Sequence, residues 1–208
     1  MGRRPDINGR ELLMAAALRL FATEGIDAVS IRAVNRAAGL GPASMHYHFG
    51  TKEALVDAVA ALHEDAVRTQ VVARAEELAG RTGASTVTAA DLVSMIAGPY
   101  LDLLDSHPAD ARDWIGLIDQ LVHVDPRRGM DSPAADAARA AIARAYPHTS
   151  TVQADRALTT CFRLLISQLA HPSTGRADPD LGFLLEFLGG GLESTMAAPS
   201  TAETVLTA

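Results

Sequence analysis

The sequence has few aromatic residues, one cysteine and no long apolar run, and each shortage excludes a class of protein. Aromatics make up 4% and apolar residues 48% of the 208 residues, so Ala, Leu, Val and Ile must build the core, and such a composition favours helices. Cys161 is the single cysteine, which excludes an intrachain disulfide and fits a reducing compartment. No apolar run approaches the roughly 18 residues of a membrane span, and the first residues lack the apolar core of a secretory signal. We therefore expect an all-α, soluble, cytoplasmic protein with no membrane partner.

Charge is divided unevenly along the chain. The formal net charge is −7, which by itself argues against nucleic-acid binding. Residues 1–55 hold seven Lys or Arg and five Asp or Glu, a net of +2, whereas residues 56–208 hold 11 and 20, a net of −9. This asymmetry is expected of a basic DNA-binding segment joined to an acidic body, with chance asymmetry as the alternative.

The segment 30–52 has the outline of two short helices joined by a tight turn. Ser30 is expected to cap the first helix with its hydroxyl, and Gly39 to end it. Gly41 and Pro42 are expected to begin the second helix, because glycine is tolerated at the N-cap and proline suits the first helical position. This pattern predicts a helix-turn-helix, whose second helix enters the DNA major groove.

A wheel projection of the second helix separates inward from outward side chains. Met45 and Phe49 are four residues apart and share the inward side. The outward and flanking positions are Ala43, Ser44, His46 and Tyr47. Small side chains let a helix approach base edges, and a hydroxyl or imidazole N–H can bond phosphate oxygens. The composition of this face therefore indicates DNA contact.

Apolar, glycine and capping residues recur at a fixed spacing through the first quarter of the chain. They are Leu13, Ala16, Leu20, Phe21, Gly25, Ser30, Ile31, Arg32, Val34, Ala38, Gly39, Leu40, Met45, His46, Tyr47, His48, Phe49, Thr51, Lys52 and Leu55. With this spacing, residues 10–55 resemble the DNA-binding region of the TetR family of bacterial transcriptional regulators.

The resemblance implies DNA-facing roles for particular residues. Ser30 and Arg32 would contact the backbone or groove edge, and Lys52 would anchor the following helix. The residues nearest the bases and phosphates would be Pro42, Ala43, Ser44, His46 and Tyr47. Arg3 and Arg4 lie in a Gly/Pro-bearing arm that can reach phosphates or the minor groove, with a solvated terminus as the alternative.

Three positions depart from the family's usual residues. His46 stands where tyrosine is usual, so its phosphate contact is expected to be pH-sensitive or absent. Asn35 stands where a small alanine is usual, and a buried amide needs hydrogen-bond partners. Gly41 replaces a commoner serine or threonine cap.

The remainder of the chain predicts a helical body. A long helix from Thr51 to about Ala79 would join the DNA-binding domain to the body, because this stretch contains neither Gly nor Pro. Further helices are expected over 88–106, 108–124 and 134–146. We expect a helix-turn-helix domain over 1–51, an effector-binding and dimerisation domain over 52–197, and a disordered tail over 198–208.

The last two helices, expected over 151–171 and 179–196, are apolar around more than half of their wheels. One side would pack on the body and the other on a second copy, giving a four-helix interface. The predicted interface residues are Leu158, Phe162, Leu165, Leu184 and Leu188. A buried hairpin in a monomer is the alternative. Gly189–Gly191 would either permit close helix contact or interrupt the helix.

Residues for an effector cavity are harder to choose. Bundle interiors are usual ligand sites, and the candidates are His63, Tyr100, Trp114 and His123. Each is an ordinary core or surface residue in the simpler interpretation; the resemblance favours a pocket without selecting its lining.

The leading hypothesis is a ligand-responsive, homodimeric DNA-binding regulator, a repressor released from a palindromic operator by an unknown small molecule. The alternative is a helical ligand- or partner-binding protein whose DNA-reading function is altered or lost, a reading motivated by His46, Asn35 and the net charge. An enzyme is not expected, because no nucleophile–base pair or phosphate-binding loop is visible. His46 and His48 diverge on a helix, so we expect no metal, and no cofactor is predicted.

Overall fold

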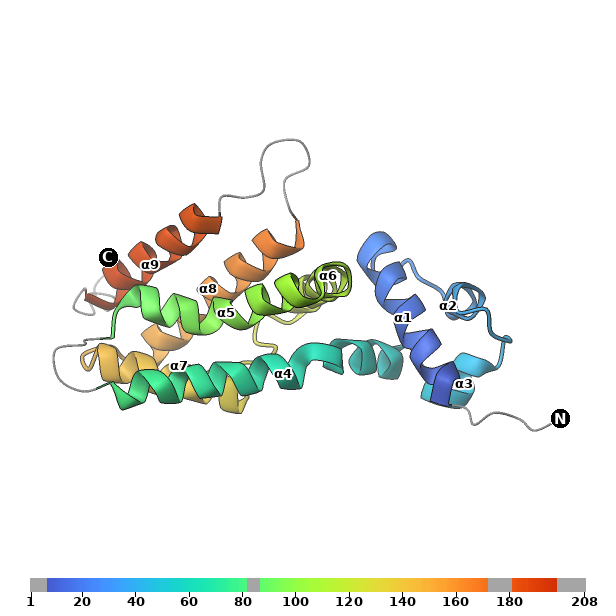
Figure 1. Cartoon of the computed structure of the whole chain (residues 1–208), viewed down its shortest axis with the longest axis horizontal. Helices are drawn as coiled ribbons and strands as arrows, with labels where there is room; N and C mark the ends of the chain where they lie inside the picture. The colour runs from blue at the N-terminus through green and yellow to red at the C-terminus, as the bar shows by residue number, and fades with distance from the viewer. Residues whose placement is uncertain (1–6, 82–86, 172–180, 198–208) are drawn as a thin grey trace, which may run out of the picture.

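The computed structural model describes residues 7–81, 87–171 and 181–197, and these residues form nine α-helices and no strand (Figure 1). The helices are α1 (Ile7–Glu24), α2 (Ile31–Ala37), α3 (Ser44–Phe49), α4 (Lys52–Gly80), α5 (Ala89–Ser106), α6 (Pro108–Val124), α7 (Pro133–Ala145), α8 (Thr151–Ala170) and α9 (Leu181–Ala197). The predicted all-α class is confirmed. Arg3, Arg4 and the predicted tail 198–208 lie outside the described residues.

Helices α1–α3 form a small N-terminal unit at one end of the molecule (Figure 1). Its core contains the fully buried side chains of Leu13, Phe21 and Met45. Gly25 ends α1: its φ is +86°, and its N–H donates to the Phe21 carbonyl at 3.1 Å. Glycine adopts this left-handed conformation without the steric cost that a side chain brings.

Helix α4 joins this unit to the rest of the chain, which we call the body (α4–α9). The Thr51 hydroxyl caps α4 by accepting the Ala54 N–H at 3.1 Å. The helix then continues for 29 residues to Gly80. Its start contacts α1 and α3, and its later turns pack against α5 and α7. A single continuous helix therefore spans both parts of the molecule, as predicted.

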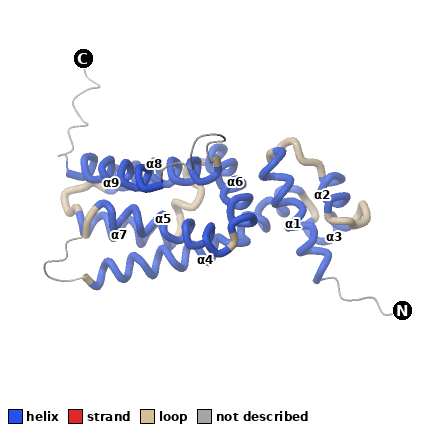
Figure 2. The backbone as a smooth tube through the Cα atoms, turned by 45° about the horizontal axis from the view of Figure 1, so that its top comes forward, coloured by secondary structure: helices blue, strands red, loops and turns tan. Residues whose placement is uncertain are grey.

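The body stacks its helices in layers. Figure 2 shows α8 and α9 along one side and α4 along the opposite side, with α5 and α7 between them. Capping residues place the helix starts: Thr88 and Asp91 form a reciprocal capping box on α5, and Pro108 occupies the first turn of α6. Within the described ranges, no helix combines the length and apolar character that crossing a membrane demands.

Helix α9 passes without interruption through Gly189–Gly191, so these glycines do not break the helix. A side-chain Cβ at Gly189 would lie 3.9 Å from backbone atoms of Ala90, an ordinary van der Waals distance, so α9 passes beside α5 here but its approach does not require a glycine. At Gly190 and Gly191 a Cβ would meet nothing of this chain within 4 Å.

The five residues predicted for a subunit interface are buried or half-buried within the single chain. Leu158, Leu165, Leu184 and Leu188 are each less than 9% exposed. Phe162 is half-buried against Tyr100, with ring centroids 6.1 Å apart. Because apolar residues cover more than half of each helix, either of two sides could face the body, and the wheel projection alone does not distinguish them. The apolar residues exposed on α8 and α9 are Val152, Leu164, Phe183 and Phe187.

Candidate functional site

The angle between α2 and α3 is held by one buried amide. Asn35 is 3% exposed; its Oδ1 accepts the Met45 N–H and its Nδ2 donates to the Pro42 carbonyl, both at 3.0 Å. The Met45 N–H belongs to the first turn of α3 and has no acceptor within that helix. Asn35 therefore caps α3 from the neighbouring helix, and the amide has both of the partners that its burial requires.

This arrangement shifts the start of α3 from the predicted position. The helix begins at Ser44, with Ala43 as a cap that makes no side-chain hydrogen bond, so the prediction of Gly41 and Pro42 as the helix start is wrong. Instead, the Ser44 N–H donates to the Gly41 carbonyl at 3.0 Å and closes a turn. Because Asn35 supplies the acceptor, a cap residue at position 41 is not needed.

The predicted DNA-contacting residues that the structure describes are all exposed or half-buried. Ser30 caps α2 by accepting the Ala33 N–H at 3.2 Å, as predicted. The Tyr47 side chain is 75% exposed, whereas Met45 is fully buried on the opposite side of α3. The other exposed members of the predicted set are Arg32, Pro42, Ala43 and His46, and Ser44 and Lys52 are half-buried. The set therefore includes small residues near the start of α3 together with hydroxyl groups and cationic side chains.

Two of these side chains already have partners in the protein. The Lys52 ammonium donates to the Asp27 carbonyl at 3.4 Å, which ties the start of α4 to the α1–α2 turn and leaves two N–H donors. His46 Nδ1 lies 2.8 Å from the Gly50 carbonyl, which can only accept, so this nitrogen carries a proton. The remaining nitrogen, Nε2, can then donate to a phosphate only when the ring is an imidazolium.

A side chain that the sequence did not single out ties the body to the N-terminal unit. Gln120 lies on α6; its Oε1 accepts the Ile26 N–H at 2.9 Å and its Nε2 donates to the Phe21 carbonyl at 2.9 Å. Both partners are backbone groups at the end of α1. Helix α6 is thereby fixed to the N-terminal unit through a second connection besides α4. A lone glutamine on a helix carries no sequence signal for such a role.

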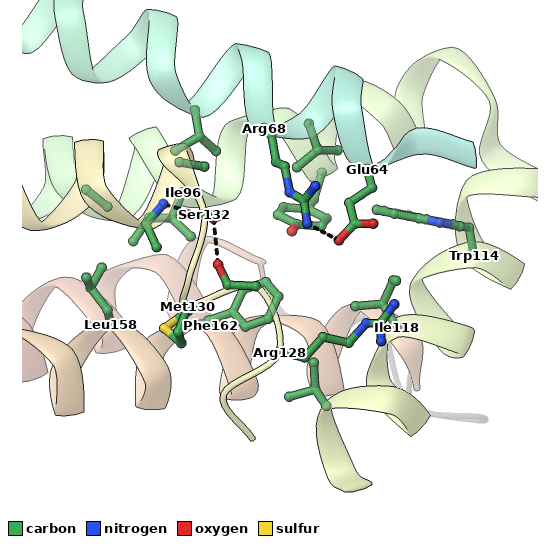
Figure 3. Close-up of a pocket in the computed structure, with 18 residues that line it drawn as sticks. Glu64, Arg68, Ile96, Trp114, Ile118, Arg128, Met130, Ser132, Leu158 and Phe162 are labelled. Atoms are coloured by element: carbon green, nitrogen blue, oxygen red, sulfur yellow. Dashed lines mark hydrogen bonds and ion pairs between the residues drawn. The ribbon is translucent and has the colours of Figure 1, made fainter. Parts of the chain in front are cut away.

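The body contains a cavity of about 100 Å³ whose lining comes from α4, α5, α6, α7, α8 and the loop between α6 and α7 (Figure 3). Most of its surface is apolar. The lining residues include Val67, Val71, Ile96, Tyr100, Trp114, Ile118, Val122, Met130, Leu158 and Phe162. A largely apolar pocket with a few polar groups is the usual form of a small-molecule site.

Two of the four predicted ligand-binding residues line this cavity. Tyr100 and Trp114 stack with ring centroids 6.2 Å apart. The Trp114 Nε1–H donates to the Ala60 carbonyl on α4 at 2.7 Å, which fixes the indole. His63 lies behind Trp114, edge-on with centroids 5.5 Å apart, and does not line the cavity. His123 lines a separate surface hollow with Arg163 and Ser167, among others.

The electrostatics around the aromatic pair follow from burial. Burial, reinforced by the neighbouring His107, lowers the pKa of His63, so the neutral imidazole is favoured there. Burial also raises the pKa of Tyr100 well above its usual range. The phenol therefore remains protonated at neutral pH and is available as a hydrogen-bond donor.

Charged residues of the cavity were missing from the predicted set. Glu64 and Arg68 lie one turn apart on α4 and form an ion pair at the cavity wall (Figure 3). Arg128 extends from the α6–α7 loop toward Ile118, on the side of the cavity where Trp114 lies. Charged residues at helical spacing are common on solvated surfaces, so the sequence held no signal that these three meet at one cavity.

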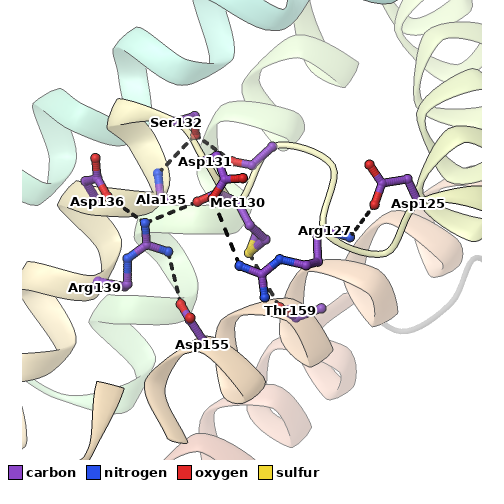
Figure 4. Close-up of polar contacts among 11 residues, drawn as sticks. Asp125, Arg127, Met130, Asp131, Ser132, Ala135, Asp136, Arg139, Asp155 and Thr159 are labelled. Carbon is purple, nitrogen blue, oxygen red and sulfur yellow. Dashed lines mark hydrogen bonds and ion pairs between the residues drawn. The ribbon is translucent and has the colours of Figure 1, made fainter. Parts of the chain in front are cut away.

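The α6–α7 loop is held in place by its own polar network (Figure 4). Arg139 donates to the Met130 carbonyl at 3.1 Å and pairs with Asp136 and Asp155. The Ser132 hydroxyl donates to the Gly129 carbonyl at 2.6 Å and caps α7 by accepting the Ala135 N–H at 3.3 Å. The loop is therefore a fixed wall of the cavity. Across the described part of the chain, no group of three or more His, Cys, Asp or Glu could hold a metal ion.

Comparisons with known proteins match the N-terminal unit to one family model and the whole chain to several solved structures of low sequence identity. Residues 13–59 match a family model described as bacterial regulatory proteins, tetR family. A solved structure of a putative TetR-family transcriptional regulator from Mesorhizobium loti is 15% identical, covers 94% of this chain and 98% of its own, and has a TM-score of 0.56. Mycobacterium smegmatis AmtR is 21% identical with coverages of 95% and 96% and a TM-score of 0.52. The multidrug binding protein EbrR, solved with imidazole, is 18% identical with coverages of 96% and 99% and a TM-score of 0.56. A comparison with curated proteins finds no match.

Proposed function

Because its N-terminal unit belongs to the tetR family of bacterial regulatory proteins, whose fold is that of DNA-binding regulators, we propose that this protein is a homodimeric, ligand-responsive transcriptional repressor. The observation that carries the proposal is the outward face of α3. There, Tyr47 is 75% exposed beside the exposed Pro42 and Ala43, while the opposite side of the helix is buried. A helix presented in this way fits the major groove.

Specific contacts follow from this orientation. Pro42, Ala43 and Ser44, at the start of α3, would approach the base edges. Phosphate contacts would come from Ser30, Arg32, His46, Tyr47 and Lys52. Arg36 is also exposed and lies one turn beyond Arg32 on α2, so we add it to the phosphate-binding set.

The exposed apolar side chains of α8 and α9 favour a homodimer. Phe187 is 59% exposed and stacks on Phe183, with centroids 6.2 Å apart. A groove of about 210 Å³ runs between the two helices and is lined by Leu164, Phe187 and Gly191, among others. Gly190 and Gly191 leave space for a neighbouring helix to approach. Two such surfaces related by a two-fold axis would make a four-helix interface, and would place two α3 helices in successive major grooves, roughly 34–36 Å apart.

The cavity supplies the site at which an effector would act. Its wall includes Trp114 and Ile118 of α6, the helix that also carries Gln120 and so contacts the N-terminal unit. A ligand that prefers one position of α6 and α4 would change the separation of the two α3 helices. It would weaken DNA binding by its differential affinity for the two arrangements.

A mobility-shift experiment with the DNA that flanks the protein's own gene tests DNA binding. The wild-type protein should shift a palindromic duplex at low salt, and Tyr47→Ala should weaken binding about tenfold, as expected for the loss of about 1.4 kcal/mol of phosphate contact. Val124→Ala is the matched control, because Val124 is 87% exposed on the body. Failure to shift any flanking duplex would contradict the proposal.

Sedimentation analysis tests the dimer. The wild-type protein should sediment as a dimer at micromolar concentration, and Phe187→Asp should produce a folded monomer, because a carboxylate at the interface would be desolvated. Val124→Asp should remain dimeric. A monomeric wild-type protein would refute the assembly.

A further inference from the structure

The charges of the residues that line the cavity do not sum to zero. Glu64 and Arg68 pair with each other on α4 and are neutral as a unit. The third charged residue is Arg128. Its Nη2 pairs with a carboxylate oxygen of Asp57 at 3.9 Å, and the Asp57 side chain is 73% exposed. A long contact to a solvated carboxylate contributes little. Among the residues that the structure describes, the cavity wall therefore has an excess of one positive charge.

Arg128 also has an unsatisfied hydrogen-bond donor. Its Nε is buried and has no partner. A buried N–H of a charged group without an acceptor is unfavourable, and native structures rarely leave one unless a ligand or water supplies the acceptor. The neighbouring backbone cannot readily rearrange to provide one, because Arg139 holds the Met130 carbonyl and Ser132 holds the Gly129 carbonyl.

The apolar part of the cavity wall limits the size and the charge of the part of the ligand that lies away from Arg128. The apolar lining and the stacked Tyr100 and Trp114 surround a volume of about 100 Å³, somewhat less than the roughly 150 Å³ of a cavity that holds one benzene ring, which sets an upper limit on the size of the ligand. The apolar body of the ligand is therefore expected to be no larger than one ring or a short acyl chain. A cationic ligand would meet an excess positive charge, and its natural acceptor, Glu64, is already occupied by Arg68.

We infer that the effector is a small organic anion: a carboxylate bound by the guanidinium of Arg128 and attached to an apolar body that occupies the space beside Tyr100 and Trp114. Arginine suits this task because its planar fork binds carboxylates through two parallel hydrogen bonds. This inference rests on the proposed function, in which the cavity is the effector site.

The same contact explains how an anion would act on DNA binding. Asp57 belongs to α4, shortly after Lys52, where the helix leaves the N-terminal unit. A ligand carboxylate competes with Asp57 for the guanidinium, so the bound anion replaces this weak contact between the α6–α7 loop and α4. We therefore expect the anion to lower the affinity for DNA more than a neutral ligand of the same shape does.

The test uses Trp114 as the reporter, since it is the only tryptophan and lies in the cavity wall. Benzoate and benzamide, which match in shape and differ in charge, are titrated at pH 7 into the full-length protein. Benzoate should quench the fluorescence at least tenfold more tightly than benzamide. Arg128→Gln should remove this preference and leave benzamide binding unchanged, and Arg128→Lys should retain part of it.

The matched control is Arg127→Gln in the same loop. Its side chain is 65% exposed and pairs with Asp131 at 4.0 Å, so the preference for benzoate should persist. Circular dichroism of each variant checks that it is folded. Equal affinity for the two probes, no quenching by either, or a preference lost in Arg68→Gln but kept in Arg128→Gln would each overturn the inference. None of these outcomes bears on DNA binding, which the mobility shift measures without ligand.

Discussion

Asn35 and Trp114 play comparable structural parts in the two regions of this protein. Each is buried and donates a hydrogen bond to a backbone carbonyl of another element. The partners of Asn35 are Pro42 and Met45, within ten residues of it, whereas Trp114 reaches Ala60, 54 residues away. The N-terminal unit is therefore organised by contacts between near neighbours in the sequence. The body depends on contacts between distant segments.

The two regions also place their functional groups differently. The N-terminal unit carries them on its surface, where Tyr47 and Arg32 are exposed. The body encloses them, so that Glu64, Arg68 and Arg128 meet at a cavity wall. A surface function tolerates an exchange of side chains with little loss of stability, but a cavity function is coupled to the packing that forms it.

The largest effect is expected from Asn35→Ala. The substitution leaves the Met45 N–H and the Pro42 carbonyl without partners, which should lower the free energy of unfolding by about 3 kcal/mol and abolish DNA binding. Urea unfolding followed by circular dichroism measures the loss. Arg36→Ala, at the next and exposed position, should change stability by less than about 0.5 kcal/mol. An Asn35→Ala protein that binds DNA normally would refute this role for the amide.

Trp114→Phe is the corresponding change in the body. It removes the bond to Ala60 and enlarges the cavity, at an expected cost of about 2 kcal/mol. DNA binding without ligand should be retained, because the outward face of α3 is unchanged. Thermal unfolding and the mobility shift give the two readouts. If the variant lost DNA binding at a temperature where it is still folded, DNA binding by the N-terminal unit would depend on the packing of the body.

Gln120→Leu breaks the connection between the regions. Loss of the bonds to Phe21 and Ile26 should cost about 1 kcal/mol, and an effector should no longer change the affinity for DNA. Gln153→Leu is the matched control, since its Nε2 donates to the Thr195 carbonyl at 2.8 Å within the body. That variant should keep the response to ligand. If an effector still changed the DNA affinity of Gln120→Leu in full, α4 alone would be sufficient to couple the cavity to the N-terminal unit.

The smallest expected effect is on the pH dependence of the free energy of unfolding. Burial lowers the pKa of His63 in the folded protein, so the unfolded chain binds the proton more tightly. The free energy of unfolding should therefore fall as the pH drops through the ordinary histidine range, about 6.5. His63→Gln should reduce this slope between pH 7 and 5.5 in thermal unfolding monitored through Trp114, whereas His148→Gln, at an exposed position, should not. An unchanged slope in His63→Gln would show that the pH dependence of stability does not come from His63.

Sequence patterns located the helix boundaries closely because caps act locally. Ser30, Thr51 and Thr88 each accept a backbone N–H three residues later, and each helix begins next to its cap. The exception is α3, where the cap comes from Asn35 on another helix. A pattern of neighbouring residues does not contain that contact, and the predicted start of α3 was therefore wrong.

The sequence by itself determined the helical class, the helix-turn-helix and the outward face of α3, because periodicity and caps act over one or two turns. Tertiary structure decided which side of α8 and α9 faces inward, that Gln120 joins α6 to the end of α1, and that Glu64, Arg68 and Arg128 share one cavity with Trp114. These features depend on how helices from distant parts of the chain pack, and no local pattern records that packing.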